Sequence, residues 1–431
     1  MSPDDSKNVC VVVLGDFGRS PRMQYHALSL AEMGHKVDVI AYGETEPMEE
    51  VKTAPLLYYH YLVPCPNIPV KIVNYAFKTV WQTLNMLFLL IIARRPDILI
   101  VQNPPAVPAL FVCWMFCRIF GCKLVVDWHN YGHTILAMSL SENSILVQIT
   151  KMVEIFVGKR ADHNFCVTQA MKHDLFTRWK IIANTLYDKP PLRFKPITLK
   201  EKHEFLLEFG KNYKEILCED GSTIFTSLVD DGDVQLKPNR PGMLVSSTSW
   251  TEDEDFSILL AALQDYEDHI TNGNHSSLPN LICFITGKGH LKQMYCNLIK
   301  ERNWQHVTVI TPWLEPHQYP LMLASADLGV SLHMSSSGLD LPMKVVDMFG
   351  CGLPVCAYYF KCLYELVQHE KNGYIFMSSD ELATQIQNWF TKFPNNEKQM
   401  EVEKKFKTAL NAFQECRWRE NWNKVAAPVF K

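Results

Sequence analysis

A stretch in the second half of the chain holds the residue types best suited to binding an anionic substrate. Residues 335–355 run through a small polar loop, a Gly, a Pro and a helix start to Lys344, Asp347 and a second Gly and Pro. Amides at the start of a helix bind phosphate oxygens, and Lys344 would add a point charge for a diphosphate. Asp347 falls three residues later on the same helix face, where it could accept hydrogen bonds from two ribose hydroxyls. A surface ion pair of these two side chains would not explain the flanking glycines and prolines.

A second cluster follows the first apolar run of the chain. Its GxxG spacing differs from the dinucleotide fingerprint GxGxxG. A tight turn here would let backbone N–H groups approach a phosphate or a sugar, with Asp16 aimed into a binding cleft. The alternative is a plain strand-to-helix turn with Ser20 as N-cap and Pro21 at the first helical position, and both can hold at once. The loop contributes four candidates for catalysis or for phosphate and acceptor contacts: Gly15, Asp16, Gly18 and Arg19.

A third cluster reads Asp-Trp-His-Asn-Tyr from residue 127 and follows a buried-strand pattern. A general base needs a tunable pKa and must reach the hydroxyl that it deprotonates, and His129 could do this. The alternative is a histidine with satisfied hydrogen bonds that packs between two domains.

Short apolar runs alternate with helical segments in both halves of the chain. Strand patterns cover residues 9–14, 36–42, 97–101, 123–126 and 163–167, and later 243–246, 280–285, 307–310, 327–332, 353–357 and 373–376. This alternation predicts parallel doubly wound sheets, which bind ligands beyond the carboxyl ends of their strands. The predicted fold class is therefore α/β, with two Rossmann-like domains facing each other across a cleft, the architecture called GT-B.

Changes in composition divide the chain into four parts. Residues 1–190 form the first predicted domain. Residues 191–241, rich in Pro and polar residues, are expected to be a linker with a helical insertion and a polar loop. Residues 242–395 form the second domain. Residues 396–431 form a helical tail, which we expect to pack back on the first domain.

Composition and charge exclude several classes of protein. The chain has 431 residues, of which 47% are hydrophobic and 20% charged, values typical of globular proteins. Lys and Arg number 42 against 46 Asp and Glu, a net charge of −4, so the global basic field of a nucleic-acid binder is missing. Thirteen cysteines without a CxxC pair indicate reduced thiols. The single sequon, at Asn274, is expected to be an ordinary loop.

Membrane segments are harder to judge from the sequence. The polar start and the short apolar run at residues 9–14 predict no N-terminal anchor or signal sequence. Residues 84–93 and 106–120 are strongly apolar, but each is shorter than a spanning helix. They predict either two buried helices that cover a parallel sheet, or helices with one face on a membrane surface and Arg residues at headgroup level.

Five motifs together make the chain resemble the chitobiosyldiphosphodolichol β-mannosyltransferase family. They lie at residues 15–26, 126–132, 246–255, 285–289 and 335–355, and the resemblance runs from about Val9 to Trp422. The family adds the first mannose to the lipid-linked chitobiose precursor of N-glycans. The resemblance therefore implies an inverting β-1,4-mannosyltransferase with GDP-mannose as donor and diphosphodolichol-linked di-N-acetylglucosamine as acceptor. It also implies that the first domain faces the acceptor and the membrane and that the second domain binds the donor.

The resemblance also implies roles for individual residues. Asp16 is the preferred candidate for the catalytic base, and His129 is the second. The diphosphate would be neutralised without a metal ion, by Lys344, nearby amides and Lys288, and no cofactor would be tightly bound. Trp313 and Leu314 lie where related enzymes read the nucleotide base, and Asp340 would bind mannose hydroxyls. The expected donor-binding residues are Gly287, Lys288, Trp313, Leu314, Gly338, Asp340, Met343, Lys344 and Asp347.

Partners and location follow from the same resemblance. The enzyme would act at the cytosolic face of the endoplasmic reticulum membrane, with GDP-mannose, dolichyl-diphosphate chitobiose, the membrane surface and other mannosyltransferases of the pathway as partners, and without nucleic acid. The alternative is a catalytically silent paralogue that binds partners in a glycosylation complex. Such a copy should have lost Lys344, Asp347 or the glycine loops, and all of them are present.

Overall fold

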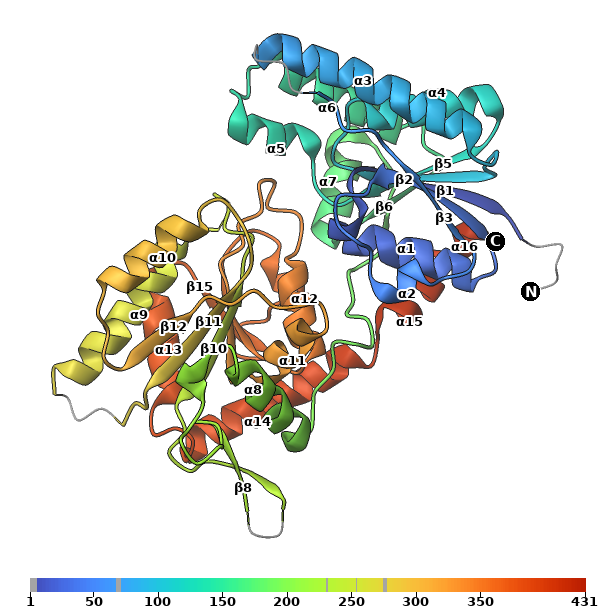
Figure 1. Cartoon of the computed structure of the whole chain (residues 1–431). Helices are drawn as coiled ribbons and strands as arrows, with labels where there is room; N and C mark the ends of the chain where they lie inside the picture. The colour runs from blue at the N-terminus through green and yellow to red at the C-terminus, as the bar shows by residue number, and fades with distance from the viewer. Residues whose placement is uncertain (1–5, 67–70, 230–231, 253, 274–276) are drawn as a thin grey trace. The chain divides into compact units, whose positions relative to one another are not determined.

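The computed structural model describes residues 6–66, 71–229, 232–252, 254–273 and 277–431, and it forms two compact units. Unit 1 comprises Met1–Asp188, Ser336–Asp340 and Trp418–Lys431. Unit 2 comprises Lys189–Ser335 and Leu341–Arg417. The chain therefore passes between the units several times. Figure 1 draws unit 1 around the blue strands and unit 2 around the yellow and orange ones.

The core of unit 1 is a parallel sheet of seven strands in the order β3-β2-β1-β4-β5-β6-β7. Residues 9–13 of the central strand are buried completely, because helices cover both faces of the sheet. The strands are β1 (Asn8–Asp16), β2 (Lys36–Tyr42), β3 (Leu57–Tyr61), β4 (Ile98–Asn103), β5 (Lys123–Trp128), β6 (His163–Cys166) and β7 (Asn184–Thr185).

Helices connect successive strands of unit 1, as in a doubly wound fold, and two further helices come from the end of the chain. A short 3-10 turn, η2 (Phe17–Arg19), leads into α1, where Pro21 occupies the first helical position, as predicted. The helices are α1 (Pro21–Glu32), α2 (Glu49–Lys52), α3 (Lys71–Ile92), α4 (Ala109–Phe120), α5 (Gly132–Ser139), α6 (Ile145–Gly158), α7 (Gln169–Trp179), α15 (Trp418–Val425) and α16 (Ala427–Phe430).

Unit 2 repeats the plan with a parallel sheet of six strands in the order β12-β11-β10-β13-β14-β15. The strands are β10 (Gly242–Ser247), β11 (Leu281–Thr286), β12 (Val307–Ile310), β13 (Leu328–Ser331), β14 (Val355–Tyr358) and β15 (Gly373–Phe376). The helices are α8 (Leu199–Gly210), α9 (Phe256–Thr271), α10 (Lys292–Glu301), α11 (Gln318–Ser325), α12 (Met343–Gly350), α13 (Ser379–Phe390) and α14 (Glu397–Gln414), with short turns η3 (Lys214–Ile216) and η4 (Leu363–Glu365).

In both sheets the strand order reverses beside the first strand, between β1 and β4 and between β10 and β13. Doubly wound sheets bind ligands at this point, beyond the carboxyl ends of the strands. The doubly wound α/β prediction is confirmed, and the predicted strands at 36–42, 307–310 and 373–376 match the structure. Strand β3 was missed because its residues Leu-Tyr-Tyr-His-Tyr form a half-exposed edge strand rather than an apolar run.

The helical insertion predicted within residues 191–241 is present as α8, but the segment belongs to unit 2 and is not a linker between the two domains. Helix α8 buries Phe205, Leu206 and Phe209 in the unit 2 core, and a capping box of Thr198 and Glu201 fixes its start. An antiparallel hairpin, β8 (Thr226–Leu228) and β9 (Val234–Leu236), follows. The segment resembled a linker because prolines and charged residues interrupt its apolar residues.

The C-terminal tail was predicted as a single helical segment that packs on the first domain, but the structure divides it between the two units. Helix α14 belongs to unit 2, where Phe406 and Leu410 are buried. From Trp418 onward the chain belongs to unit 1, and Trp418 and Trp422 pack beside α1. The two tryptophans lie four residues apart on one helix face, so a single short helix buries both.

The apolar segment at 84–93 is the end of a much longer helix. Helix α3 begins at Lys71, and its part Tyr75–Ile92 is long and apolar enough to cross a membrane by length and composition. The predicted length was therefore too short, while α4 is indeed shorter than a span. The buried-helix alternative holds for only one face of α3, where Met86 and Leu90 are buried.

Two predictions on side-chain chemistry can be placed here. All thirteen cysteines are free thiols, as the sequence predicts. The sequon at residues 274–276 lies outside the described residues.

Candidate functional site

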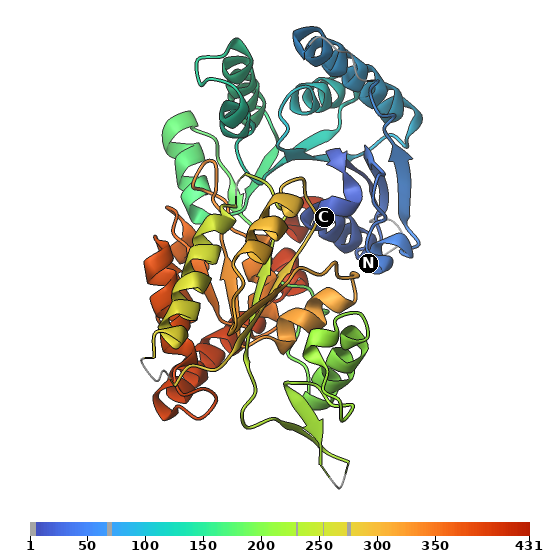
Figure 2. The same ribbon diagram turned by 60° about the vertical axis from the view of Figure 1, so that its left-hand side comes forward.

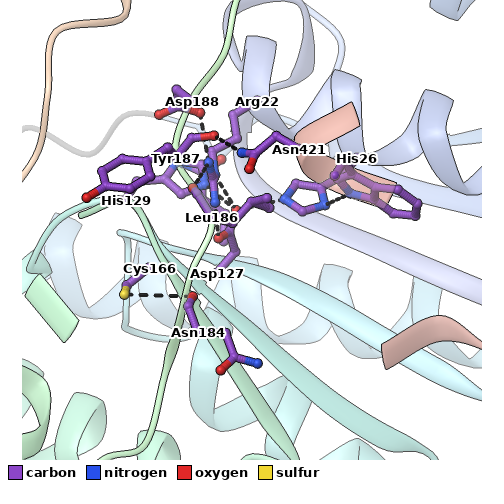
Figure 3. Close-up of polar contacts among 12 residues, drawn as sticks. Arg22, His26, Asp127, His129, Cys166, Asn184, Leu186, Tyr187, Asp188 and Asn421 are labelled. Atoms are coloured by element: carbon purple, nitrogen blue, oxygen red, sulfur yellow. Dashed lines mark hydrogen bonds and ion pairs between the residues drawn. The ribbon is translucent and has the colours of Figure 1, made fainter. Parts of the chain in front are cut away.

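At the carboxyl edge of the unit 1 sheet, one carboxylate organises a buried network of charged side chains (Figure 3). Asp127, on β5, receives two hydrogen bonds from the Arg22 guanidinium of α1, at 2.8 Å from Nε and 2.9 Å from Nη2. His26 Nε2, one helical turn later on α1, lies 3.2 Å from Asp127 Oδ2. His129 Nε2 lies 2.8 Å from the same oxygen. Helix α1 and strand β5 thus deliver three partners to one carboxylate.

The network compensates its own charges. Burial by itself would raise the pKa of Asp127, but the charge and the hydrogen bonds of the Arg22 guanidinium hold that pKa well below its usual range. Arg22 is buried too, and its Nη1 also donates to Asp188 and to the Leu186 carbonyl. Asp127 is therefore an anion and Arg22 a cation at neutral pH, and each satisfies the other.

Asp127 also determines which nitrogen of His129 carries a proton. An ionised carboxylate can only accept, so His129 Nε2 donates to Asp127 and Nδ1 keeps its lone pair in the neutral ring. The backbone N–H of His129 donates to the Asn103 carbonyl at 2.8 Å, which holds the residue at the end of β5. The side chain is 22% exposed. That His129 is a base therefore stays a prediction.

Side chains of helix α15, near the C-terminus, form hydrogen bonds with the same network. Trp422 Nε1 donates to His26 Nδ1 at 3.0 Å, so the His26 proton is on Nε2, toward Asp127. Burial lowers the pKa of His26, so this ring is neutral. Asn421 Nδ2 donates to the Tyr187 carbonyl, next to the Leu186 carbonyl that Arg22 binds (Figure 3). The last residues of the chain thereby help to place a group in its first domain.

The loop after β1 holds Asp16 at the same edge of the sheet. Asp16 Oδ1 accepts the Thr45 N–H at 3.1 Å, and Oδ2 lies 3.5 Å from Nε of the largely exposed Arg19. Oδ2 is buried and accepts no hydrogen bond from the described residues. Ser20 occupies the N-cap position, but its hydroxyl donates to the Asp16 carbonyl instead of capping α1.

The two glycines of this loop are not equivalent. A Cβ on Gly18 would lie 2.4 Å from the Thr45 carbonyl oxygen, so only glycine allows the two loops to approach. A Cβ on Gly15 would meet only a Val13 methyl group at 3.8 Å, an ordinary contact. The tight turn expected at both positions therefore constrains only Gly18.

Two predicted donor-binding residues, Gly338 and Asp340, are counted with unit 1. Asp340 Oδ1 accepts Asn130 Nδ2 at 3.0 Å, and the Leu339 carbonyl accepts the Thr168 hydroxyl at 2.6 Å. Gly338 has φ of 70°, a left-handed conformation that favours glycine. Asp340 is thus joined to the residue that follows His129.

A buried carboxylate also stabilises the loop after His129. Glu154, on α6, accepts the Gly132 N–H at 2.6 Å, His133 Nδ1 at 2.6 Å and Asn103 Nδ2 at 2.9 Å. Asn103 Nδ2 also donates to the Asn130 carbonyl. Residues 129–133 are therefore held by side chains from the ends of β4 and from α6.

In unit 2, glycines at the carboxyl edge let backbone segments come unusually close. A Cβ on Gly287 would lie 1.8 Å from the Thr248 carbonyl oxygen, and φ of Gly287 is 145°. A Cβ on Gly289 would lie 1.9 Å from the Ser249 carbonyl oxygen. The Gly-Lys-Gly loop after β11 therefore lies directly on the loop after β10.

Lys344 and a buried glutamate form the charged centre of this edge. Lys344 Nζ, in the first turn of α12, lies 2.7 Å from Oε1 of Glu254, whose side chain is 2% exposed. Glu254 Oε2 accepts the Thr248 hydroxyl at 2.7 Å and the Ser249 N–H at 2.9 Å. Lys344 itself is 28% exposed, so its ammonium is oriented by Glu254 and open to a ligand.

Other predicted donor-binding residues gather around the ends of β11 and β12. Lys288 Nζ lies 3.7 Å from the centre of the Trp313 ring, in cation–π contact. Lys292, on α10, donates to the carbonyls of Gly287 and Thr311, which ties the two loops together. Leu314, four residues after the end of β12, is buried in the unit 2 core.

Asp347 lies near enough to Tyr319 of α11, in the same unit, to affect its pKa. Burial raises the pKa of the Tyr319 phenol well above its usual value, and the nearby Asp347 charge adds to the effect. Both Asp347 and Met343, which begins α12, are half-buried. The structure thus brings Gly287, Lys288, Trp313, Leu314, Met343, Lys344 and Asp347 into one unit, at the carboxyl edge of its sheet.

The sequence alone did not single out several residues on which these sites depend. Arg22 and His26 lie in the quoted 15–26 motif, and Glu254 lies in the 246–255 motif. A signal existed for Arg22 and His26, because charged or polar side chains four residues apart in an apolar helix must be paired when buried. Their partner Asp127 is about a hundred residues away and cannot be recognised from the helix.

Comparisons with known proteins agree with this geometry. Residues 22–186 match the model of Glycosyltransferase Family 4, and residues 231–409 match that of Glycosyl transferases group 1. Solved structures with the same fold include a glycosyltransferase from Rickettsia africae, with a TM-score of 0.65, 14% identity and coverage of 99% of this chain and 98% of that one. Another is WaaG, a glycosyltransferase involved in lipopolysaccharide biosynthesis, with a TM-score of 0.63, 13% identity and coverage of 98% and 99%. The fold is GT-B, as predicted.

Sequence relatives are much closer than these structures. Chitobiosyldiphosphodolichol β-mannosyltransferase of Homo sapiens is 44% identical over 98% of this chain and 92% of its own length. The protein of that name in Dictyostelium discoideum is 38% identical over 98% and 93%. A UDP-glycosyltransferase of Arabidopsis thaliana, TURAN, is 43% identical over 97% and 96%. With nearly full-length identity at this level, the chain belongs to the chitobiosyldiphosphodolichol β-mannosyltransferase family.

Proposed function

We propose that the protein is an inverting β-1,4-mannosyltransferase that transfers the first mannose from GDP-mannose to diphosphodolichol-linked chitobiose. The observation that best supports this proposal is the position of Lys344 in the first turn of α12. Its Nζ lies 2.7 Å from Oε1 of Glu254, at the same edge of the sheet as the Gly287 loop. The acceptor and the sugar follow from the names of relatives that match nearly the whole chain. The GDP moiety and the inversion remain part of the proposal.

The donor would bind at the carboxyl edge of unit 2. Lys344 and Lys288 would face the diphosphate, and Asp347 would accept hydrogen bonds from the ribose hydroxyls. Trp313 and Leu314 would lie against the guanine, and Asp340 would bind mannose hydroxyls. We propose that these side chains and the amides near residues 338–343 stabilise the leaving group, with no resident metal ion and no tightly bound cofactor.

Inversion follows from one in-line displacement. O4 of the terminal N-acetylglucosamine attacks C1 of mannose, the bond from C1 to the diphosphate oxygen breaks, and GDP leaves with that electron pair. The proton of O4 passes to a base of unit 1. An α-linked donor then yields a β-linked product.

We propose Asp16 as that base, because its Oδ2 is buried and accepts no hydrogen bond from the described residues. His129 is the competing candidate, since Asp127 holds its ring with the Nδ1 lone pair available. The kinetics of two variants separate them. If Asp16 is the base, Asp16→Asn lowers kcat by about 100-fold or more, while His129→Gln keeps a kcat near that of the wild type.

A transfer assay tests the function itself. Purified protein receives phytanyl-diphosphate chitobiose and GDP-mannose, with UDP-glucose and UDP-N-acetylglucosamine as control donors. We expect one added hexose with GDP-mannose alone, removable by β-mannosidase. Protein that binds GDP but makes no product would favour the silent paralogue, and product from a control donor would overturn the proposed donor.

The location of the enzyme is part of the proposal. We propose that it acts at the cytosolic face of the endoplasmic reticulum membrane, because a dolichol-linked acceptor is confined to a bilayer. We also propose that other mannosyltransferases of the pathway bind it in a complex. Protease protection in isolated microsomes tests the side: added protease should degrade the protein without detergent.

A further inference from the structure

Helix α3 exposes a continuous apolar stripe that its own unit leaves uncovered. Leu84, Phe88 and Ile91 follow one another at spacings of four and three residues, which places them on one helix face. They are 61%, 61% and 65% exposed. The opposite face of the helix, with Met86, Leu89 and Leu90, is buried in the unit 1 core. The exposed stripe is therefore outside the core, although it is as apolar as the core.

Neighbouring helices extend the stripe. Helix α4 contacts α3 and α6, and α6 contacts α5. Figures 1 and 2 show α3, α4 and α6 on the same side of the unit 1 sheet. Trp114 of α4 packs edge-on against Phe156 of α6 with ring centres 4.8 Å apart. We call the exposed side chains of these helices the apolar face: Leu84, Phe88 and Ile91 of α3, Phe111 and Ile119 of α4, Met138 of α5, and Ile145, Ile149 and Met152 of α6.

Basic residues outnumber acidic ones in the segment that carries the apolar face. Residues 71–160 contain nine Lys or Arg but four Asp or Glu, a balance of +5 in a chain whose net charge is −4. Two of the four acids, Asp127 and Glu154, are buried and paired. Lys78 and Arg118 lie on exposed turns of α3 and α4. An apolar surface bordered by cations fits anionic lipid headgroups above an acyl layer.

From this geometry we infer that the apolar face docks the protein on the surface of an anionic bilayer, with α3, α4 and α6 partly immersed. Surface docking differs from a span. Although Tyr75–Ile92 is long enough to cross a membrane, a spanning helix would have to withdraw Met86, Leu89 and Leu90 from the core. Docking keeps those contacts and covers the exposed stripe with lipid.

The docked face would also lie close to the unit 1 site. Helix α5 starts at Gly132, directly after the loop of His129, and ends at Ser139 beside Met138 of the apolar face. Eight residues of helix span about 12 Å. An acceptor whose diphosphate emerges from the bilayer at this helix would be near His129, and this step rests on the proposed function. The inference that the apolar face docks on a bilayer does not depend on the proposed function.

Vesicle flotation tests the inference on the full chain. Wild-type protein is mixed with vesicles of phosphatidylcholine, with or without phosphatidylserine, and the floated fraction is measured. One variant combines Leu84→Gln, Phe88→Gln and Ile91→Gln, and a second combines Ile145→Gln, Ile149→Gln and Met152→Gln. The matched control is Met294→Gln with Leu298→Gln, two apolar side chains exposed to 47% and 40% on α10 of unit 2.

We expect wild type and control to float with anionic vesicles and each apolar-face variant to lose at least about tenfold in binding. Unchanged flotation of both variants would overturn the inference. So would wild-type protein that resists carbonate extraction, which would indicate a span, or variants that change only from dimer to monomer, which would assign the face to a second copy.

Folding and function have separate readouts. Circular dichroism and GDP binding report whether each variant is folded, and transfer to a detergent-dispersed short-chain acceptor reports the active site without a bilayer. If wild type floats but transfers no mannose, docking stands and the proposed function fails. If it transfers mannose but never floats, the docking surface fails alone.

Discussion

The two units solve the same problem, a charged group at the carboxyl edge of a parallel sheet, in different ways. In unit 1 the charges are buried and neutralise one another, with Asp127 bound to Arg22, His26 and His129. In unit 2 the central cation, Lys344, stays partly exposed and only its partner Glu254 is buried. The unit 1 network fixes side-chain orientation, whereas the unit 2 edge keeps a charge available to a ligand.

Backbone packing differs in the same way. The unit 2 edge depends on glycines, because the loop of Gly287 and Gly289 lies against carbonyls of the loop after β10. In unit 1 Gly18 allows one such approach, to the Thr45 carbonyl, but side chains of Glu154 and Asn103 hold the loop of residues 129–133. We therefore expect the buried network of unit 1 to be sensitive to loss of a charge and the Gly287 loop of unit 2 to gain of a methyl group.

The largest effect should come from removing the unit 1 carboxylate. Asp127→Ala leaves the buried Arg22 with Asp188 as its remaining carboxylate partner, so we expect a loss of about 3–5 kcal/mol in unfolding free energy. Urea denaturation followed by circular dichroism measures this loss. Glu46→Ala, at an exposed ion pair, is the control and should leave the midpoint unchanged. A loss under about 1 kcal/mol for Asp127→Ala would mean that the network is not compensated as described.

The next effect concerns a methyl group in unit 2. Gly287→Ala puts a Cβ within 1.8 Å of the Thr248 carbonyl oxygen, so the loops must separate. We expect about 1–3 kcal/mol lower stability from backbone strain, together with weaker GDP binding. Calorimetry of GDP binding and urea denaturation measure the two effects. Gly15→Ala, whose Cβ makes an ordinary 3.8 Å contact, is the matched control, and equal behaviour of the two variants would contradict the close-approach argument.

Lys344 should matter for turnover more than for stability. Lys344→Ala should lower kcat/KM at least 10-fold, from loss of about 1.5–3 kcal/mol of charged hydrogen bonding to the donor. Glu254 keeps the Thr248 hydroxyl and the Ser249 N–H, so the protein should remain folded. Asp347→Ala should fall in the same range.

Steady-state kinetics with varied GDP-mannose measures the Lys344 effect. Lys300→Ala, an exposed lysine on α10, controls for the general loss of a positive charge. Wild-type kinetics in both Lys344→Ala and Asp347→Ala would remove the proposed donor site.

The smallest effect is a pH dependence of unit 1. Because burial lowers the pKa of His26, the unfolded chain binds more protons than the folded one below the ordinary histidine pKa of about 6.5. Stability should therefore be complete above that pH and decrease as the pH falls through it. His26→Gln should flatten this slope between about pH 5 and 7, measured by urea denaturation at several pH values. His35, whose pKa burial also lowers, leaves a residual slope. An unchanged slope would show that His26 does not titrate differently on folding.

Local sequence determined much of this architecture. Buried parallel strands appear as continuous apolar runs, so the doubly wound class and several strand boundaries could be predicted. Elements without that signal were missed, such as the half-exposed edge strand β3. The Lys344–Asp347 spacing could be recognised in the sequence because both residues lie on one helix, whatever surrounds them.

The tertiary structure determined which residues compensate the charges of Lys344 and Arg22. Glu254 is ninety positions from Lys344, and Asp127 is 105 from Arg22, so neither pair has a local signature. The same holds for Trp422, which reaches His26 from the far end of the chain, and for the exposed side of α3. Hydrophobic periodicity is a property of neighbours in sequence, whereas compensation of a buried charge depends on neighbours in space, which exist only after the chain has folded.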